Sequence, residues 1–136
     1  RSYKKPNKTE RSGLVTSRVG QGYYRQLIRD KWNNKCPVTG CEIIRILISS
    51  HIVPWSECSK NERLDVENGI LLSPNIDSLF DRHLISFSDE GEILYSKKIS
   101  INEQEKLGIP KDVKIPITDG MKPFLKRHRK RFNENN

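Results

Sequence analysis

The sequence predicts an α+β fold with a two-stranded antiparallel ribbon and one following helix at its centre. Residues 42–49 are rich in β-branched side chains, which favours a strand, and the short apolar run 69–72 is its predicted partner. Directly afterwards, Ser73 and Pro74 are residue types preferred at the N-cap and first turn of a helix, which is predicted to continue through Asp81. With 136 residues and a hydrophobic fraction of 34%, the chain has material for one domain with a compact core.

Further elements flank this centre on both sides. Residues 21–32 place Tyr24, Leu27, Ile28 and Trp32 near helical spacing, so an amphipathic helix is predicted there. The other predicted elements are a polar loop with a short helical turn at 54–67, a hairpin formed by 84–87 and 92–95 around the turn SDEG, and helices at 99–107 and 118–133.

The chain is basic, with 25 lysines and arginines against 17 acids and a formal net charge of +8. The excess lies at the ends, so residues 1–18 are interpreted as a basic N-terminal segment or linker, and residues 19–136 as the domain, with its core at 42–83 and a basic helix at 118–133. A basic surface attracts nucleic acid by releasing counterions, although such runs are also found as solvated tails. The residues predicted to contact DNA are Arg82, Lys126, Arg127, Arg129, Lys130 and Arg131.

The sequence also indicates a cellular compartment. No apolar stretch approaches the roughly 20 residues needed to span a membrane, and no signal peptide is visible, so we expect a cytoplasmic protein that does not bind a membrane. The chain has three cysteines, and this odd number does not indicate a disulfide framework. Cys36 and Cys41 are separated by four residues and no second pair follows, so a structural zinc site is not favoured.

The candidate site is a set of polar residues in the predicted ribbon and helix. His51 follows the apolar run 43–48, Asn68 precedes the second strand, and Asp77 and Asp81 lie four apart on the helix, hence on one face. Two carboxylates with few other donors suit one Mg²⁺ or Mn²⁺ ion. A neutral His51 would accept a proton from the attacking water, and Asn68 would orient His51 through a hydrogen bond.

Each of these residues also has a purely structural interpretation. His51 at a strand end is compatible with an ordinary structural histidine, and Asn68 followed by Gly69 is an ordinary turn pair. Asp77 in the first turn would complement the helix dipole, and Asp81 would pair with the neighbouring Arg82.

The motifs together resemble the HNH family of endonucleases, in particular a restriction-type subgroup. The matching segments are SHIVPW at 50–55, NGILL at 68–72, DSLFD at 77–81, GQGYYRQL at 20–27, CPVTG at 36–40 and ISFSDEGEI at 85–93. The resemblance covers roughly residues 18–100. It implies a ββα-metal nuclease core with flanking helices and an extra β-hairpin, built around a single divalent metal.

The resemblance also implies a role for each site residue. His51 falls on the general base, Asn68 on the middle asparagine and Asp77 on the helix metal ligand, while Asp81 falls on a second position that supplies a ligand in some members. Two residues depart from the family pattern. Ser50 stands where many members have an aspartate or histidine ligand, and is a spectator or an accessory to the metal. His83 stands where a small residue or glycine is expected.

These observations lead us to expect a metal-dependent endonuclease that hydrolyses DNA, as the cleavage domain of a restriction or defence nuclease. One active site cuts one strand, so double-strand cleavage requires two copies, and a homodimer is a possible partner arrangement. A domain of this size contacts mainly phosphates, so target choice is expected to come from an additional recognition domain outside residues 1–136. The alternatives are a catalytically inactive DNA-binding module and a zinc-stabilised interaction domain built on the cysteines.

Overall fold

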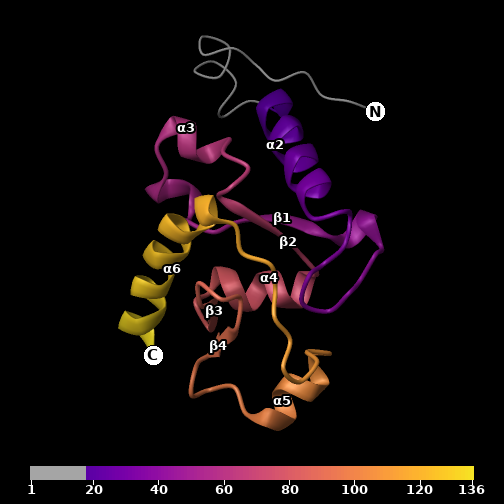
Figure 1. Cartoon of the computed structure of the whole chain (residues 1–136), viewed down its shortest axis with the longest axis vertical. Coiled ribbons are helices and arrows are strands. Elements are labelled where there is room, and N and C mark those ends of the chain that lie inside the picture. The colour runs from indigo at the N-terminus through magenta and orange to yellow at the C-terminus, as the bar shows by residue number, and fades with distance from the viewer. Residues whose placement is uncertain (1–17) are drawn as a thin grey trace.

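The structure is a computed structural model that describes residues 18–136 (Figure 1). The predicted basic N-terminal segment therefore lies outside the described residues, except for Arg18, which begins the first helix. The elements are α2 (Arg18–Lys31), η1 (Ile44–Ile46), β1 (Ile48–His51), η2 (Trp55–Glu57), α3 (Lys60–Arg63), β2 (Gly69–Leu72), α4 (Pro74–Asp81), β3 (Ile85–Phe87), β4 (Ile93–Tyr95), α5 (Ile101–Lys106), η3 (Asp119–Met121) and α6 (Lys122–Asn135). None of the described helices combines the length and the apolar character needed to cross a membrane.

A two-stranded ribbon with a helix on either side forms the centre of the fold. Strands β1 and β2 pair antiparallel, with a register that runs from Ile48 opposite Leu72 to His51 opposite Gly69. Both α2 and α4 contact β1, and Figure 1 places them on opposite sides of the ribbon. Every residue of β2 is buried, as expected for a strand that is covered on both faces. The predicted α+β fold with a ββα centre is therefore confirmed.

The prediction of a strand over 42–49 is wrong in its extent. Only Ile48–His51 pairs, and Ile44–Ile46 is a 3₁₀ helix. The partner strand contributes only Gly69–Leu72, so a longer first strand would leave backbone groups without ladder partners. Two of the β-branched residues outside the ladder are instead solvent-exposed, Ile43 at 62% and Ile46 at 45%.

The other predicted elements agree with the structure. Helices α2, α4, α5 and α6, the strand β2, the short helical turn in the loop before it and the β3–β4 hairpin all lie where the sequence placed them, within a few residues. Ser73 occupies the N-cap of α4 in an extended conformation and Pro74 begins the helix. The Ser73 hydroxyl does not cap the helix backbone, however, and donates to the side-chain oxygen of Asn75 at 3.0 Å.

The C-terminal helix α6 is packed into the domain through one face. Its buried residues are Phe124, Leu125, His128 and Phe132. The His128 ring stacks on Phe80 of α4, with ring centroids 3.9 Å apart, and on His83, at 4.3 Å. Its Nε2 lies 2.8 Å from the Phe80 carbonyl, which can only accept, so Nε2 is protonated and Nδ1 accepts from the Ser86 hydroxyl at 2.8 Å.

His83 follows α4 with a positive φ of 56°, the left-handed conformation in which glycine is favoured. This backbone conformation explains why a glycine is expected at position 83. The ring that stands there is buried in the stack on His128, and its Nε2 has no hydrogen-bond partner among the described residues.

Gly69, at the start of β2, is the point of closest approach between the ribbon and α2. A Cβ atom at this position would overlap the hydroxyl of Tyr24 and the side chain of Ile28. The Trp32 indole donates to the Gly69 carbonyl at 3.1 Å, and so α2 rests directly on the backbone of β2.

Replacing Gly69 by alanine is expected to lower the free energy of unfolding by about 1–3 kcal/mol, because the added methyl group overpacks the contact between β2 and α2. Gly22→Ala is the matched control. Gly22 lies inside α2 with no atom within 4 Å of an added Cβ, so alanine is expected to stabilise the chain by about 0.5–1 kcal/mol. Urea unfolding of both variants checks the opposite signs, and equal effects would contradict the close approach at Gly69.

Acid should destabilise the fold through His128. Burial lowers the pKa of this histidine from its ordinary 6.5 to about 3, so the unfolded chain binds a proton between pH 6.5 and 3 that the folded chain does not. The free energy of unfolding should therefore fall by about 1.4 kcal/mol per pH unit from this group as the pH drops through that window. His128→Phe retains an aromatic ring but does not titrate.

The free energy of unfolding of the wild type relative to that of His128→Phe, measured by urea unfolding, should fall steadily from pH 7 to pH 4. A difference that stays constant across this range would contradict the assignment of a neutral, buried His128.

Candidate active site

His51 lies at the end of β1 with its ring held on three sides. Nε2 is 2.8 Å from the backbone carbonyl of Arg63, the ring stacks on Tyr24 with centroids 4.1 Å apart, and Trp55 contacts it edge-on at 5.5 Å. Because a carbonyl can only accept, Nε2 carries the proton and Nδ1 keeps its lone pair. No other hydrogen bond to the His51 ring is found among residues 18–136, so Nδ1 can accept a proton.

The surroundings of His51 favour the neutral ring. Burial is the largest influence and lowers its pKa below the ordinary value, and the positive charge of Arg63 acts in the same direction. The hydrogen bond to the Arg63 carbonyl opposes these two effects without cancelling them. His51 is therefore a neutral imidazole near neutral pH, the protonation state that a general base requires.

The side chain of Asn68 bonds to the loop after β1 and not to the His51 ring. Its side chain is fully buried, and its oxygen accepts from the Val53 amide at 2.9 Å. Its amide nitrogen donates to the Glu62 carbonyl at 3.1 Å and to the Cys58 sulfur at 3.3 Å. Asn68 therefore fixes the loop that follows His51, and this loop supplies the Arg63 carbonyl.

The backbone carbonyl of Asn68 supports the same ring from the other side. It accepts the Tyr24 hydroxyl at 2.6 Å, and Tyr24 is the residue that stacks on His51. No local pattern predicts this bond, because Tyr24 and Asn68 are 44 residues apart. Asn68 thus acts on His51 indirectly, through Tyr24 and through the loop.

Asp77 of α4 lies beside Ser50 of β1. Adjacent residues of a strand point to opposite faces, so Ser50 faces α4 while His51 faces α2. No hydrogen bond, ion pair or ring contact among the described residues joins His51 to either aspartate. The Ser50 hydroxyl acts to lower the pKa of the Asp77 carboxyl, which makes Ser50 a neighbour of the predicted metal ligand.

The charge state of Asp77 reflects this environment. Burial, the largest influence, and the nearby Asp81 carboxylate raise its pKa, whereas the Ser50 hydrogen bond and Arg82 act in the opposite direction, and the net shift is upward. Asp77 is half-buried and Asp81 is exposed. The two carboxylates are thus close enough to interact, as their spacing on the helix predicts.

The donor set around Asp77 fits a hard divalent cation held largely by oxygen and water. Two carboxylates and one hydroxyl are hard oxygen donors, and the upward pKa shift marks negative charge that a cation would compensate. Within residues 18–136, no group of three or more histidine, cysteine, aspartate or glutamate side chains is placed to enclose a metal. A cation at this position would therefore rely on water and phosphate oxygens for its remaining ligands.

The cysteines are engaged in local hydrogen bonds. All three are free thiols, and Cys36 is buried. The Cys36 sulfur lies 3.7 Å from the Ser73 hydroxyl, to which it donates, and the Cys58 sulfur donates to the Val53 carbonyl at 3.3 Å.

Three of the predicted DNA-binding arginines form ion pairs within the domain. Arg127 pairs with Glu62 at 2.7 Å, Arg131 with Glu57 at 2.6 Å, and Arg129 with Asp89 at 2.9 Å. Arg127 and Arg131 therefore join α6 to the loop between His51 and Asn68, and Arg129 joins it to the hairpin.

The other predicted DNA-binding residues are solvent-exposed. Arg82 is bonded to the Ser78 hydroxyl at 2.6 Å. Lys126 and Lys130 are exposed and enter no ion pair in the part of the chain that the structure describes. These three side chains are thus in a position to meet a solvent-borne ligand.

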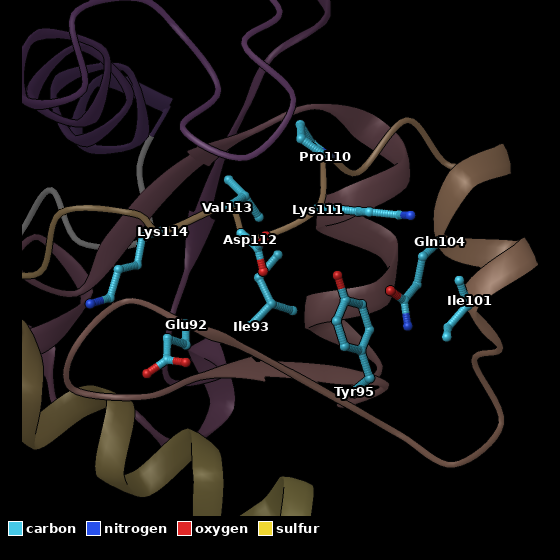
Figure 2. Close-up of a pocket in the computed structure, with 10 residues that line it drawn as sticks. All are labelled: Glu92, Ile93, Tyr95, Ile101, Gln104, Pro110, Lys111, Asp112, Val113 and Lys114. Atoms are coloured by element: carbon cyan, nitrogen blue, oxygen red, sulfur yellow. The ribbon is translucent and has the colours of Figure 1, made fainter.

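Two pockets differ in whether predicted site residues line them. A pocket of about 400 Å³ lies beside His51 and Trp55, between α2 and β1. A larger pocket of about 610 Å³ lies between β4, α5 and the segment 110–114, as Figure 2 shows. The larger pocket contains none of the predicted site residues, and its charged lining of two lysines and two acids is balanced. Of these two pockets, the smaller is the one that a predicted site residue, His51, lines.

Comparison with known families gives one match. The model of a family described as HNH endonuclease matches residues 36–88, the segment that contains Ser50, His51, Asn68, Asp77 and Asp81. No curated protein matches the chain.

Replacing Asn68 by alanine should destabilise the domain by about 1–3 kcal/mol, because the buried Val53 amide loses the side-chain oxygen to which it donates. Asn61→Ala is the control, since Asn61 is exposed and a change there is expected to stay within about 0.5 kcal/mol. Urea unfolding measures both, and equal midpoints for the two variants would show that the Asn68 network is not formed.

Proposed function

Residues 36–88 belong to the HNH endonuclease family, and from this premise we propose that the chain is a metal-dependent nuclease domain that hydrolyses DNA in a restriction or defence protein. The observation that carries the proposal is the state of His51. Its ring is neutral, its Nε2 is fixed by the Arg63 carbonyl, and its Nδ1 is free to take a proton. The buried His128 is also neutral with its Nε2 on a backbone carbonyl, but its Nδ1 is occupied by the Ser86 hydroxyl, whereas Nδ1 of His51 is not bonded to any residue of 18–136.

His51 acts as the general base in this proposal. Nδ1 removes a proton from the attacking water as the water approaches the phosphorus. The proton on Nε2 remains bonded to the Arg63 carbonyl, so the ring keeps its orientation while it becomes charged. Tyr24 and Trp55 restrict the ring to one plane, which limits the movement that would misdirect the proton transfer.

Asp77 and Asp81 are the residues that would hold a divalent cation such as Mg²⁺ or Mn²⁺, with Ser50 as an accessory. When bound, the cation stabilises negative charge on the phosphate and on the leaving oxygen. The Ser50 hydroxyl lies beside the Asp77 carboxyl and acts to lower its pKa, which favours the charged form that a cation requires. Hydrolysis in the manner of the family would leave a 5′-phosphate and a 3′-hydroxyl.

The net charge of the chain indicates the class of substrate, and its single candidate site indicates which partners it needs. The net charge of +8 favours a polyanion, and Lys126, Lys130 and Arg82 are exposed cations available to phosphates. One such site cuts one strand, so we propose that double-strand cleavage requires a second copy of the chain. Sequence selection would come from a further recognition domain.

Replacing His51 by alanine should lower the rate of plasmid nicking in Mg²⁺ or Mn²⁺ by about 10²- to 10⁴-fold, because the general base is lost. Binding of the same plasmid should change little, because the His51 ring is neutral and contributes no charge to DNA binding. Asp77→Asn should fail differently, through a higher metal concentration needed for half-maximal nicking.

Asp30→Asn provides the matched control for the carboxylate, since Asp30 is exposed on α2 and should leave both readouts unchanged. Equal nicking by the wild type and His51→Ala would reject the proposed base. Binding of DNA without any metal-dependent nicking by the wild type would favour an inactive DNA-binding module.

A further inference from the structure

The pocket beside His51 is walled by a helix that lies outside the family-matched segment. Its lining comes from α2, from β1 and from the loop that follows β1. The lining residues are Gln21, Tyr24, Arg25, Leu47, Ile48, Ser49, His51, Trp55 and Leu64. Arg25 is the positively charged residue among them, and none of them is acidic.

Arg25 is fixed to the same face of β1 as His51. The Ser49 hydroxyl donates to the Arg25 backbone carbonyl at 3.2 Å, and the preceding residue, Tyr24, stacks on the His51 ring. Ser49 and His51 are two apart on the strand, so both side chains point towards α2. The position of Arg25 relative to His51 is therefore set by two adjacent contacts.

The guanidinium of Arg25 differs from the arginines of α6. Arg127 and Arg131 are neutralised by glutamates, whereas Arg25 is exposed and enters no ion pair within residues 18–136. Gln21 is one helical turn earlier on the same face of α2 and adds an amide to the pocket. The pocket thus presents an uncompensated cation and a neutral donor beside the proposed base.

We infer that Arg25, assisted by Gln21, binds a backbone phosphate of the DNA strand next to the phosphate that His51 serves. A nucleic-acid strand carries one phosphate per nucleotide, so a cleft that places one phosphate at His51 must also accommodate its neighbours. A guanidinium is suited to this task because it donates two parallel hydrogen bonds to phosphate oxygens. Arg25 is a positioning residue, and the inference rests on the proposed nuclease function.

Arg25→Ala tests this inference directly. Binding of a labelled 30-base-pair duplex is measured in EDTA over a range of salt concentrations, so that cleavage does not interfere. Loss of one phosphate contact should weaken binding about tenfold at low salt and reduce the slope of log K against log salt by about 0.9. In nicking assays KM should rise while kcat stays within about threefold.

Two further variants define the role. Arg25→Lys keeps the charge and should retain most of the salt slope, with a smaller rise in KM. Lys97→Ala removes one positive charge at an exposed position far along the chain, between β4 and α5, and should behave like the wild type. Equal urea midpoints for the Arg25 variants and the wild type show that the changes arise from DNA binding.

The outcomes separate this inference from the proposed function. Nicking by the wild type, none by His51→Ala and unchanged binding and KM in Arg25→Ala would overturn the inference and leave the function standing. A loss of kcat at saturating DNA with an unchanged salt slope would also overturn the positioning role. If the wild type does not nick DNA, the proposed function fails, and the salt slope in EDTA still decides whether Arg25 contacts phosphate.

Discussion

The polar groups of Asn68 form hydrogen bonds to the two segments that hold the His51 ring, which are the loop after β1 and helix α2. Its side chain binds the loop at Val53, Cys58 and Glu62, and its carbonyl binds Tyr24. Because Asn68 is fully buried, each of these bonds forms where water cannot replace it, and a broken one is costly. The orientation of the His51 ring depends on this network, although no bond connects the two side chains. Asn68 therefore supports the His51 ring indirectly, through Tyr24 and through the backbone of the loop after β1.

The two faces of β1 divide the chemistry of the site. Ser50 points to α4 and lies beside Asp77, whereas His51 points to α2 and to the pocket that contains Arg25. A hydroxyl at position 50 adds no negative charge beside the two aspartates, so their mutual repulsion is not increased. Cation affinity in oxygen sites rises with the number of charged ligands. Under the proposed function, this site would bind its metal weakly alone and more tightly once a phosphate contributes oxygens.

The sequence predicted those features that local pattern determines. Helical spacing located α2, and Ser73–Pro74 located the start of α4, because both signals lie within a few residues. The extent of β1 was not predictable in this way, since its length is limited by a partner strand about twenty residues away. The bond from Tyr24 to Asn68 spans 44 residues, and composition cannot show it. The same is true of the proximity of Ser50 to Asp77, because the face that each strand residue takes depends on the register.

The C-terminal basic run shows why charge counts are ambiguous. Arg127 and Arg131 contribute to the net charge of +8, yet each is paired with a glutamate on the segment between His51 and Asn68. Exposed ion pairs contribute little stability individually, and the buried face of α6 provides most of the docking. The arginines instead fix where α6 touches the loop that carries the Arg63 carbonyl. The basic helix therefore affects the site by supporting the loop around His51, and the cations left for DNA are those without acidic partners.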